Sequence, residues 1–549
     1  MNVRKMKRLA GLPALAVVTI ALALGWPGLS GAADAEAAKA APPVKMNTTA
    51  DHSQFKELQQ PFKSGPDVTK ACLTCHTEAA KQVHKSIHWT WELNNPDTGQ
   101  RLGKKHLVNS YCVSITSNYA RCTSCHVGYG WKDASFDFSS EQNVDCLVCH
   151  DTTGAYKKFP TGAGHPAYQD TEFGGKPFKA VDLVQVAQHV GRTSRATCGA
   201  CHFSGGGGDG VKHGDMDTSL GKPGEALDVH MNADGLNYSC ATCHTFINHQ
   251  STGSRYAVTA KDETGIAMPG VKETRATCES CHGTAPHQAD LNNRLNTHAD
   301  KVACETCHIP AMARGGKATK TWWDWSTAGQ KGEDGKPLIK KDEKGNVTYD
   351  GMKGDFVWGE NLIPEYFWFD GQVRYSLLEE KIDDSTGVAE INSIRGSHGD
   401  PTARIWPFKV MRGKQPYDTE NKTLLVGHLF GKDDAAYWKT YDWDKALRAG
   451  MQEAKAVGQT GGDYSGNYGF IETKMYWPLT HMVAPKEEAL GCDSCHSHDG
   501  RLAKLTGFYL PGRDANAWID RIGWFLVIAT LAGVLLHGLA RLFIRRRSA

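Results

Sequence analysis

Eight copies of one short motif dominate this chain of 549 residues. Each copy has two cysteines separated by two residues and followed directly by a histidine, and together the copies use 16 of the 17 cysteines. Such a run attaches haem c, because both thiols add to the porphyrin vinyl groups and the histidine takes one axial face of the iron. Structural zinc and disulfides also use paired cysteines, but neither needs a histidine after every pair.

We therefore predict eight covalently attached haem c groups, each with its iron. The attaching cysteines are Cys72, Cys75, Cys122, Cys125, Cys146, Cys149, Cys198, Cys201, Cys240, Cys243, Cys278, Cys281, Cys304, Cys307, Cys492 and Cys495. The motif histidines, one axial ligand each, are His76, His126, His150, His202, His244, His282, His308 and His496.

The motif spacing limits the fold of the predicted haem domain, residues 65–510. Seven motifs lie before residue 309, and the gaps between them are too short for separate globular units. We expect a mainly α fold with extensive loops, a multihaem cytochrome c fold wrapped around eight haems, plus one C-terminal transmembrane helix. Haems held this close together conduct electrons along the chain.

Residues 309–491 carry no motif and are predicted to be an aromatic and helical segment. We expect its tryptophans to pack against porphyrin faces and each other rather than to form a binding platform. Residues 433–458 show a helical pattern, with Leu447, Met451 and Ala454 on one face, Asp433 or Asp434 as the cap and Gly458 at the end. Residues 329–354 are rich in Lys, Asp and Gly and are predicted to form an exposed hairpin or loop.

The N-terminus has the pattern of an export signal. Basic residues precede an apolar run, and small residues predict cleavage after Ala33, with Ala35 as the alternative. Residues 1–33 are thus predicted to be a signal peptide, and 34–64 a flexible tether without apolar periodicity. Attachment of c-type haem normally takes place outside the bacterial cytoplasm, which agrees with an exported chain.

The C-terminus has the pattern of a membrane anchor. A juxtamembrane segment, 511–521, precedes a predicted transmembrane helix, 522–543, and a basic tail, 544–549. The arginines after the span place the tail in the cytoplasm and the haem domain on the periplasmic side of the inner membrane. His537 lies within the span, where a haem b ligand, a quinone-site residue and a contact with another subunit are all open.

One stretch joins a haem motif to several possible ligands. Four glycines follow the motif that ends at His202, and Asp209, Lys212 and His213 come next. Glycines allow the backbone to turn sharply beside a flat cofactor, although alone they would favour a flexible surface loop. Cys112 is the only cysteine outside the motifs and precedes Cys122 by ten residues, so it can lie beside that haem or be an apolar filler.

The chain resembles the octahaem tetrathionate reductase family of multihaem cytochromes c, which is related to the hydroxylamine oxidoreductase-like octahaem cytochromes. The resemblance rests on residues across the haem domain: His88-Trp89, Tyr111-Cys112, the motif at Cys122 continued to Trp131, Arg195 through Asp217, Asp228 to Met231, Trp406 to Tyr417, and Thr480 to Pro485. The C-terminal span lies outside this resemblance.

The resemblance implies that seven haems have two histidine ligands and that the eighth is reactive, with His126 and Lys212 as its ligands. It also implies active-site roles for Asp209 and Cys112. The expected distal histidines number one more than seven haems require: His88, His213, His230, His249, His287, His298, His428 and His481. Weaker candidates are His84, His106, His165, His189, His398 and His498.

These expectations predict a periplasmic, membrane-anchored octahaem reductase of small oxidised sulfur or nitrogen compounds such as tetrathionate, nitrite and hydroxylamine. Lys212 would supply a ligand and a local charge, Asp209 a proton relay, and Cys112 a sulfur for sulfur substrates. Two alternatives remain: a non-catalytic electron conduit to a partner reductase, and an oxidase like hydroxylamine oxidoreductase.

Expected partners are a small inorganic substrate and either the membrane quinol pool or a membrane cytochrome b-type donor, with a homo-oligomer possible. The net charge of +2 gives no electrostatic case for a nucleic-acid partner.

Overall fold

The computed structural model describes residues 50–108, 112–205, 207–263, 276–287, 293–459 and 462–547. The predicted signal peptide and residues 34–49 of the predicted tether lie outside these ranges, as does Tyr111.

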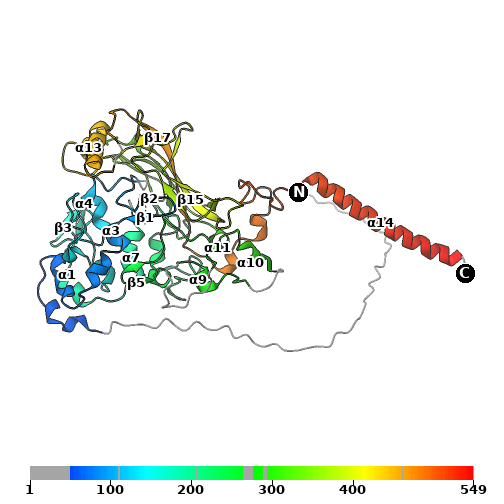
Figure 1. The fold of residues 1–549 in the computed structure, drawn as a ribbon, viewed down its shortest axis with the longest axis horizontal. Helices are drawn as coiled ribbons and strands as arrows, with labels where there is room; N and C mark the ends of the chain where they lie inside the picture. The colour runs from blue at the N-terminus through cyan, green and yellow to red at the C-terminus, as the bar shows by residue number, and fades with distance from the viewer. Residues whose placement is uncertain are drawn as a thin grey trace, which may run out of the picture. The chain divides into compact units, whose positions relative to one another are not determined.

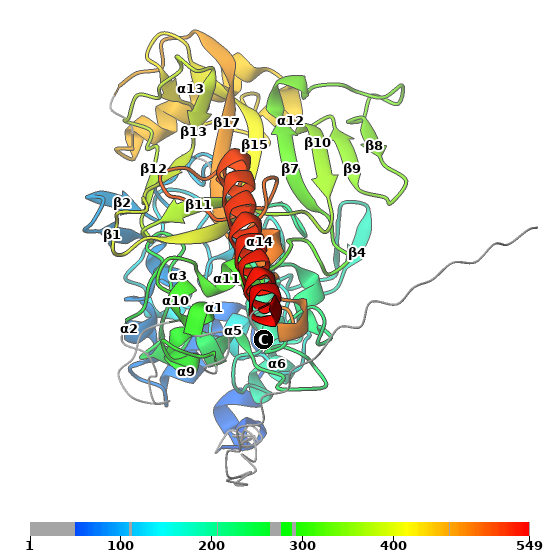
Figure 2. The same ribbon diagram turned by 90° about the vertical axis from the view of Figure 1, so that its right-hand side faces the viewer.

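A nine-stranded sheet forms much of the C-terminal half of the haem domain (Figures 1 and 2). Its strand order is β13-β17-β15-β7-β10-β9-β8, and β11 and β16 also pair with β15. The bounds are β7 Thr319–Asp324, β8 Ile339–Lys341, β9 Val347–Asp350, β10 Gly354–Gly359, β11 Glu365–Phe369, β13 Val388–Glu390, β15 Arg404–Asp418, β16 Thr423–Leu424 and β17 Tyr468–Pro478. β15 runs antiparallel to β17 along its length and parallel to β7.

The expectation of a mainly α fold is therefore wrong. Most of the tryptophans assigned to porphyrin packing lie in strands, among them Trp323 of β7, Trp368 of β11 and Trp406 of β15. Nearly every residue of β15 is buried. Aromatic and β-branched side chains fit a pleated, buried surface, so the same residues that suggested cofactor packing favour strands here.

The haem motifs lie on short helices or helical turns, which Figure 1 shows on one side of the sheet. The α-helices are α1 Gly65–Leu73, α2 Ala79–Val83, α3 Ile87–Thr90, α4 Tyr119–Cys122, α5 Leu147–His150, α6 Leu183–Gln188, α7 Arg195–His202, α8 Cys240–Cys243, α9 Glu279–His282, α10 Arg294–His298 and α11 Cys304–His308. The 3-10 turns are η1 His52–Gln54, η2 Lys56–Leu58, η3 Thr123–Cys125, η4 Glu141–Asn143, η5 Thr218–Gly221, η7 Trp325–Thr327, η8 Lys486–Glu488 and η9 Cys492–Ser494.

Four small two-stranded ladders complete the strands. They pair β1 Leu93–Asn95 with β2 Gln100–Leu102, β3 Thr171–Phe173 with β4 Lys176–Phe178, β5 Phe246–Ile247 with β6 Gln250–Ser251, and β12 Val373–Tyr375 with β14 Asn392–Ile394.

The predicted helix at 433–458 is two helices. α12, Tyr437–Thr440, ends at Tyr441, whose left-handed backbone has a φ of 60°, and α13 covers Trp443–Ala456. Asp442 caps α13 by accepting from the Lys445 N–H, so the predicted cap is wrong. The buried face is confirmed, because Leu447, Met451 and Ala454 are all buried.

Two further boundaries differ from the prediction, and one segment agrees. Residues 50–64 are not a tether, since η1 and η2 fold there and Leu58 is buried in an apolar cluster. At the other end, α14 spans Ala517–Arg547, so the helix starts inside the predicted juxtamembrane segment and continues into the predicted tail. The predicted hairpin at 329–354 is confirmed as the antiparallel pair β8 and β9, with β8 exposed.

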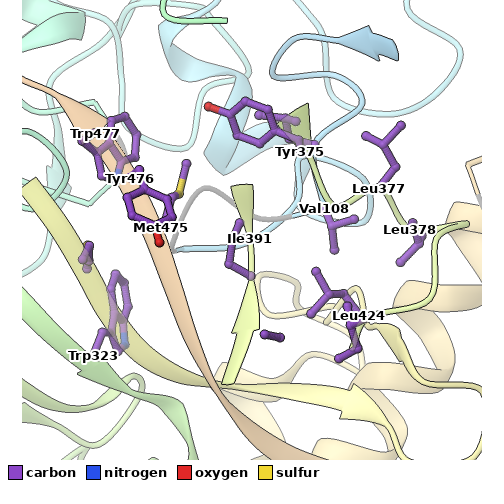
Figure 3. Close-up of a cluster of buried hydrophobic side chains, with 14 of the residues drawn as sticks. Val108, Trp323, Tyr375, Leu377, Leu378, Ile391, Leu424, Met475, Tyr476 and Trp477 are labelled. Carbon is purple, nitrogen blue, oxygen red and sulfur yellow. The ribbon is translucent and has the colours of Figure 1, made fainter. Parts of the chain in front are cut away.

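The largest buried cluster packs on the sheet (Figure 3). The cluster includes Trp323 of β7, Met475 of β17, Tyr375 of β12 and Ile391, which lies between β13 and β14. This core packs against β15 and β7, which hold the candidate site described below.

Candidate haem and substrate site

Seven of the eight motif histidines lie opposite a second histidine. The ring centroids of each pair are 6.0 to 6.4 Å apart. With the motif histidine first, the pairs are His76 and His52, His150 and His249, His202 and His88, His244 and His481, His282 and His230, His308 and His287, and His496 and His298.

Hydrogen bonds orient several of these rings. Nδ1 of His150 lies 2.7 Å from the Gly191 carbonyl oxygen, and Nδ1 of His249 lies 2.8 Å from Oε1 of Gln82. An occupied Nδ1 leaves Nε2 as the nitrogen available to a metal, and this is the usual arrangement around metal-bound histidines. The paired rings, each beside a Cys-x-x-Cys segment, therefore fit covalently attached haem.

Thiols of different motifs also come together. Four pairs of thiols from different motifs lie close enough to affect each other's pKa: Cys72 and Cys146, Cys125 and Cys201, Cys198 and Cys240, and Cys278 and Cys304. Because each of these thiols would attach to a porphyrin, the four contacts would bring haems of different motifs close together.

His126 is the exception among the motif histidines. Within the described ranges no histidine ring lies against it, and it is enclosed by aromatic rings, with Trp131 at 4.9 Å and Trp89 at 5.1 Å. Its Nε2 lies 2.7 Å from the Trp89 carbonyl oxygen, and its Nδ1 is buried without a hydrogen-bond partner. Burial lowers the pKa of His126 to about 3, so the ring is neutral.

Lys212 lies near this motif. The lysine is 8% exposed, and charge on Cys112 or Cys122 acts on its amine. Burial, followed by the charges of Lys104 and Arg255, lowers the pKa of Lys212 to about 7. A neutral amine has a lone pair that can bind a metal, whereas an ammonium has none.

The sheet holds the segment that carries Lys212. Nζ of Lys409, on β15, lies 3.2 Å from the Val211 carbonyl oxygen and 2.6 Å from Oγ1 of Thr319, on β7. The Thr319 hydroxyl is in turn 2.8 Å from the Gly210 carbonyl oxygen. Lys409 is fully buried, and burial lowers its pKa to about 7 although the charge of Asp215 opposes that shift.

Gly210 is required at this approach of two backbones. Its φ is +67°, and a Cβ there would lie 2.2 Å from the Ala318 carbonyl oxygen. A side chain would push the Lys212 segment away from β7.

Cationic side chains surround Lys212. Nζ of Lys104 lies 4.5 Å above the ring of Trp91, which itself lies 5.3 Å from His126. The Arg255 guanidinium lies 4.9 Å above the ring of Trp477. These cations make the site attractive to small anions.

The other two predicted active-site residues, Cys112 and Asp209, lie in different surroundings. Cys112 is half-buried and lines a cavity of about 20 Å³ together with Trp325, Leu425 and Trp443. Asp209 accepts hydrogen bonds from the Thr218 backbone N–H, at 2.9 Å, and from the Thr218 hydroxyl, and no contact with Lys212 is found within the described part of the chain.

Within the described residues, two predicted distal histidines have no motif histidine opposite them. His213 meets the ring of Trp477 at 4.9 Å. His428 bonds Ser117 through Nδ1 and Asp433 through Nε2, at 2.8 and 3.0 Å. Both rings are held by other residues.

The weaker candidates also have other contacts. His84 stacks on Trp89, His106 bonds Glu92, His165 bonds Tyr168, His189 bonds the Gln185 carbonyl oxygen, His398 stacks on Phe508, and His498 bonds Asp499.

His52 was missed in the sequence. It lies in the stretch assigned to the tether, where the only available signal was the histidine itself. Its ring stacks on that of His76 with an angle of 14° between the planes.

Three cytochrome families match parts of the chain. Their descriptions are "Cytochrome c554 and c-prime" for residues 71–151, "Cytochrome c7 and related cytochrome c" for 225–309, and "Cytochrome c bacterial" for 320–499. No curated protein matches the chain.

One solved structure is similar along most of the chain. The octahaem cytochrome c from Shewanella oneidensis is 42% identical, with a TM-score of 0.71, and the match covers 82% of this chain and 95% of that one.

Proposed function

This chain belongs to the multihaem cytochrome c family, and from that premise we propose that it is a periplasmic, membrane-anchored octahaem reductase of small oxidised sulfur or nitrogen compounds. Membership of the family brings covalently bound haem c and electron transfer. The observation that carries the more specific proposal is the difference between His126 and the other seven motif histidines, which each face a second histidine.

The seven pairs are proposed to be the axial ligands of seven haems. Such haems exchange electrons but leave no coordination position for a substrate. Six of the distal residues are those expected from the sequence, and His52 completes the set in place of His213 and His428.

The eighth haem, attached by Cys122 and Cys125, is proposed to be the reactive one, with His126 and Lys212 as its ligands. Haem c supplies a redox-active iron that exchanges one electron at a time. The buried environment of Lys212 favours its neutral form. Lys104 and Arg255 add positive charge around it, which supports anionic substrates such as tetrathionate and nitrite over neutral hydroxylamine.

Cys112 and Asp209 receive different roles in this proposal. Cys112 is close enough to interact electrostatically with Lys212, which supports contact between its sulfur and a sulfur substrate. The Asp209 carboxylate is turned towards Thr218, so a proton relay through Asp209 would require its side chain to turn away from Thr218.

The membrane part of the proposal rests on α14. Among the described residues, one helix is long and apolar enough to cross a membrane, at Ala517–Ile544, and none of its most apolar window is buried. We propose that it anchors the haem domain at the periplasmic face, where the quinol pool or a cytochrome b-type subunit would supply electrons.

Ligand-binding spectra of the reduced protein test the catalytic proposal. Carbon monoxide should bind one haem in eight after displacement of the lysine, and replacement of Lys212 by alanine should make that binding faster. An electron conduit in which every haem iron has two histidine ligands would bind no carbon monoxide. That result would contradict the proposal that the protein is a reductase.

A further inference from the structure

Asp215 is a buried carboxylate three residues after Lys212. It is 1% exposed, and its Oδ2 accepts the backbone N–H groups of Thr480 and His481 at 2.7 and 3.0 Å. The same oxygen lies 3.3 Å from Nδ1 of the His481 ring, and the neutral Thr480 hydroxyl lies 3.2 Å from that nitrogen. That ring faces the motif histidine His244 at a centroid distance of 6.3 Å.

A charged partner distinguishes His481 from the other paired histidines whose Nδ1 contacts the structure describes. Those contacts are neutral oxygens: Gln82 Oε1 for His249, Asn296 Oδ1 for His287, and the carbonyls of Gly191, Thr252, Arg294 and Pro511 for His150, His244, His298 and His496. Asp215 is the one carboxylate in this group.

The chemistry of the contact predicts its effect. A carboxylate that accepts from Nδ1–H increases the electron donation of the opposite nitrogen to a metal. Stronger donation and a nearby negative charge both favour ferric over ferrous iron, so they lower the reduction potential.

The position of Asp215 connects this contact to the reactive site. Its second oxygen, Oδ1, is buried without a hydrogen-bond partner and lies 4.0 Å from Nδ1 of His213, the residue after Lys212. The motifs are also linked, because Cys240 meets Cys198 and Cys201 meets Cys125. The haem at Cys198 would therefore lie between the haem at Cys240 and the one at Cys122.

We propose that Asp215 is a positioning residue for His481 that holds the haem attached by Cys240 and Cys243 at a lower reduction potential than a neutral partner would. This inference rests on the proposed ligation of that haem by His244 and His481. A low reduction potential at this haem, which the haem at Cys198 separates from the reactive one, favours electron delivery towards the substrate.

Two reciprocal variants test it by spectroscopic redox titration. Asp215→Asn keeps an oxygen acceptor but removes the charge, and it should raise one haem potential by roughly 59 mV, a tenfold change for a one-electron couple. Gln82→Glu puts a carboxylate against His249. It should lower the reduction potential of a different haem by a similar amount. Both variants should keep eight haems and every low-spin bis-histidine signal.

Separate outcomes distinguish this inference from the proposed ligation. If His481→Ala leaves every low-spin signal unchanged, the ligand assignment is wrong. If His481→Ala removes one signal but Asp215→Asn moves no potential, the role of Asp215 is overturned and the ligation stands.

A measurement on the unmodified ferric protein covers the case in which Asp215→Asn does not mature. Near-infrared magnetic circular dichroism should show one bis-histidine charge-transfer band at higher energy than the rest, because a stronger imidazole donor raises that transition. A single band position for all bis-histidine haems would overturn the inference.

Discussion

At the scale of single residues, the arrangement depends on which histidines face each other. His52 stacks on His76, whereas His428 is held by Ser117 and Asp433. The two residues therefore differ in role, although a histidine-rich sequence offers little to separate them.

His52→Ala should convert one low-spin haem into a high-spin or water-ligated form while eight haems remain attached, because the thioethers do not depend on the distal ligand. Electron paramagnetic resonance of the ferric protein measures this change. His428→Ala is the matched control and should leave all low-spin signals in place. The same loss in both variants would show that His52 acts through folding rather than ligation.

Residue types alone predicted the attachment sites, because each Cys-x-x-Cys-His run is local and needs no knowledge of the fold. Distal ligands depend on contacts between distant segments, as between His244 and His481. Because the sequence has more histidines than distal positions, His213 and His428 stayed among the candidates. His52 was not considered, because it lies in the stretch predicted to be a flexible tether.

At the scale of elements, β15 and β7 determine where the Lys212 segment lies. Nζ of Lys409 reaches the Val211 carbonyl oxygen and Thr319 from the centre of the sheet. This sheet was not predicted, because the apolar residues of β15 follow one another without alternation where both of its faces are buried. By contrast, the periodicity of α13 was visible in the sequence because one of its faces is exposed.

Lys409 gives a prediction about pH. Burial lowers its pKa to about 7 in the folded state, whereas the unfolded value stays near the ordinary ~10.4. Between these values the unfolded chain binds the extra proton, so this residue makes the free energy of unfolding rise with pH above 7.

Lys409→Met should remove that contribution. The stability advantage of the unchanged protein over the variant should grow by up to about 1.4 kcal/mol per pH unit between pH 7 and 9. Urea unfolding at three pH values, followed by circular dichroism, measures the difference. An advantage that stays constant between pH 7 and 9 would show that the folded lysine stays charged.

At the scale of the whole molecule, the haem domain is expected to carry the redox activity and α14 to anchor the protein in the membrane. The haem domain has its own core around the sheet, while the apolar residues of α14 are exposed. An exposed apolar helix of this length is stable in a bilayer and unfavourable in water.

Deletion from Ala517 onwards should therefore release a soluble protein with all its haems and with unchanged activity towards dye electron donors. Fractionation of periplasm and membranes, with a haem stain, measures the outcome. Retention of the truncated protein in membranes would place the anchor elsewhere in the chain.

The central claim is that one haem of eight is ligated by Lys212 rather than by a second histidine. Electron paramagnetic resonance of Lys212→Ala, compared with the exposed-lysine control Lys222→Ala, tests it most directly. The account predicts that Lys212→Ala keeps eight haems, changes one low-spin signal to a high-spin or water-ligated form and strongly alters turnover, while the control changes nothing. Unchanged spectra and turnover in Lys212→Ala would contradict it.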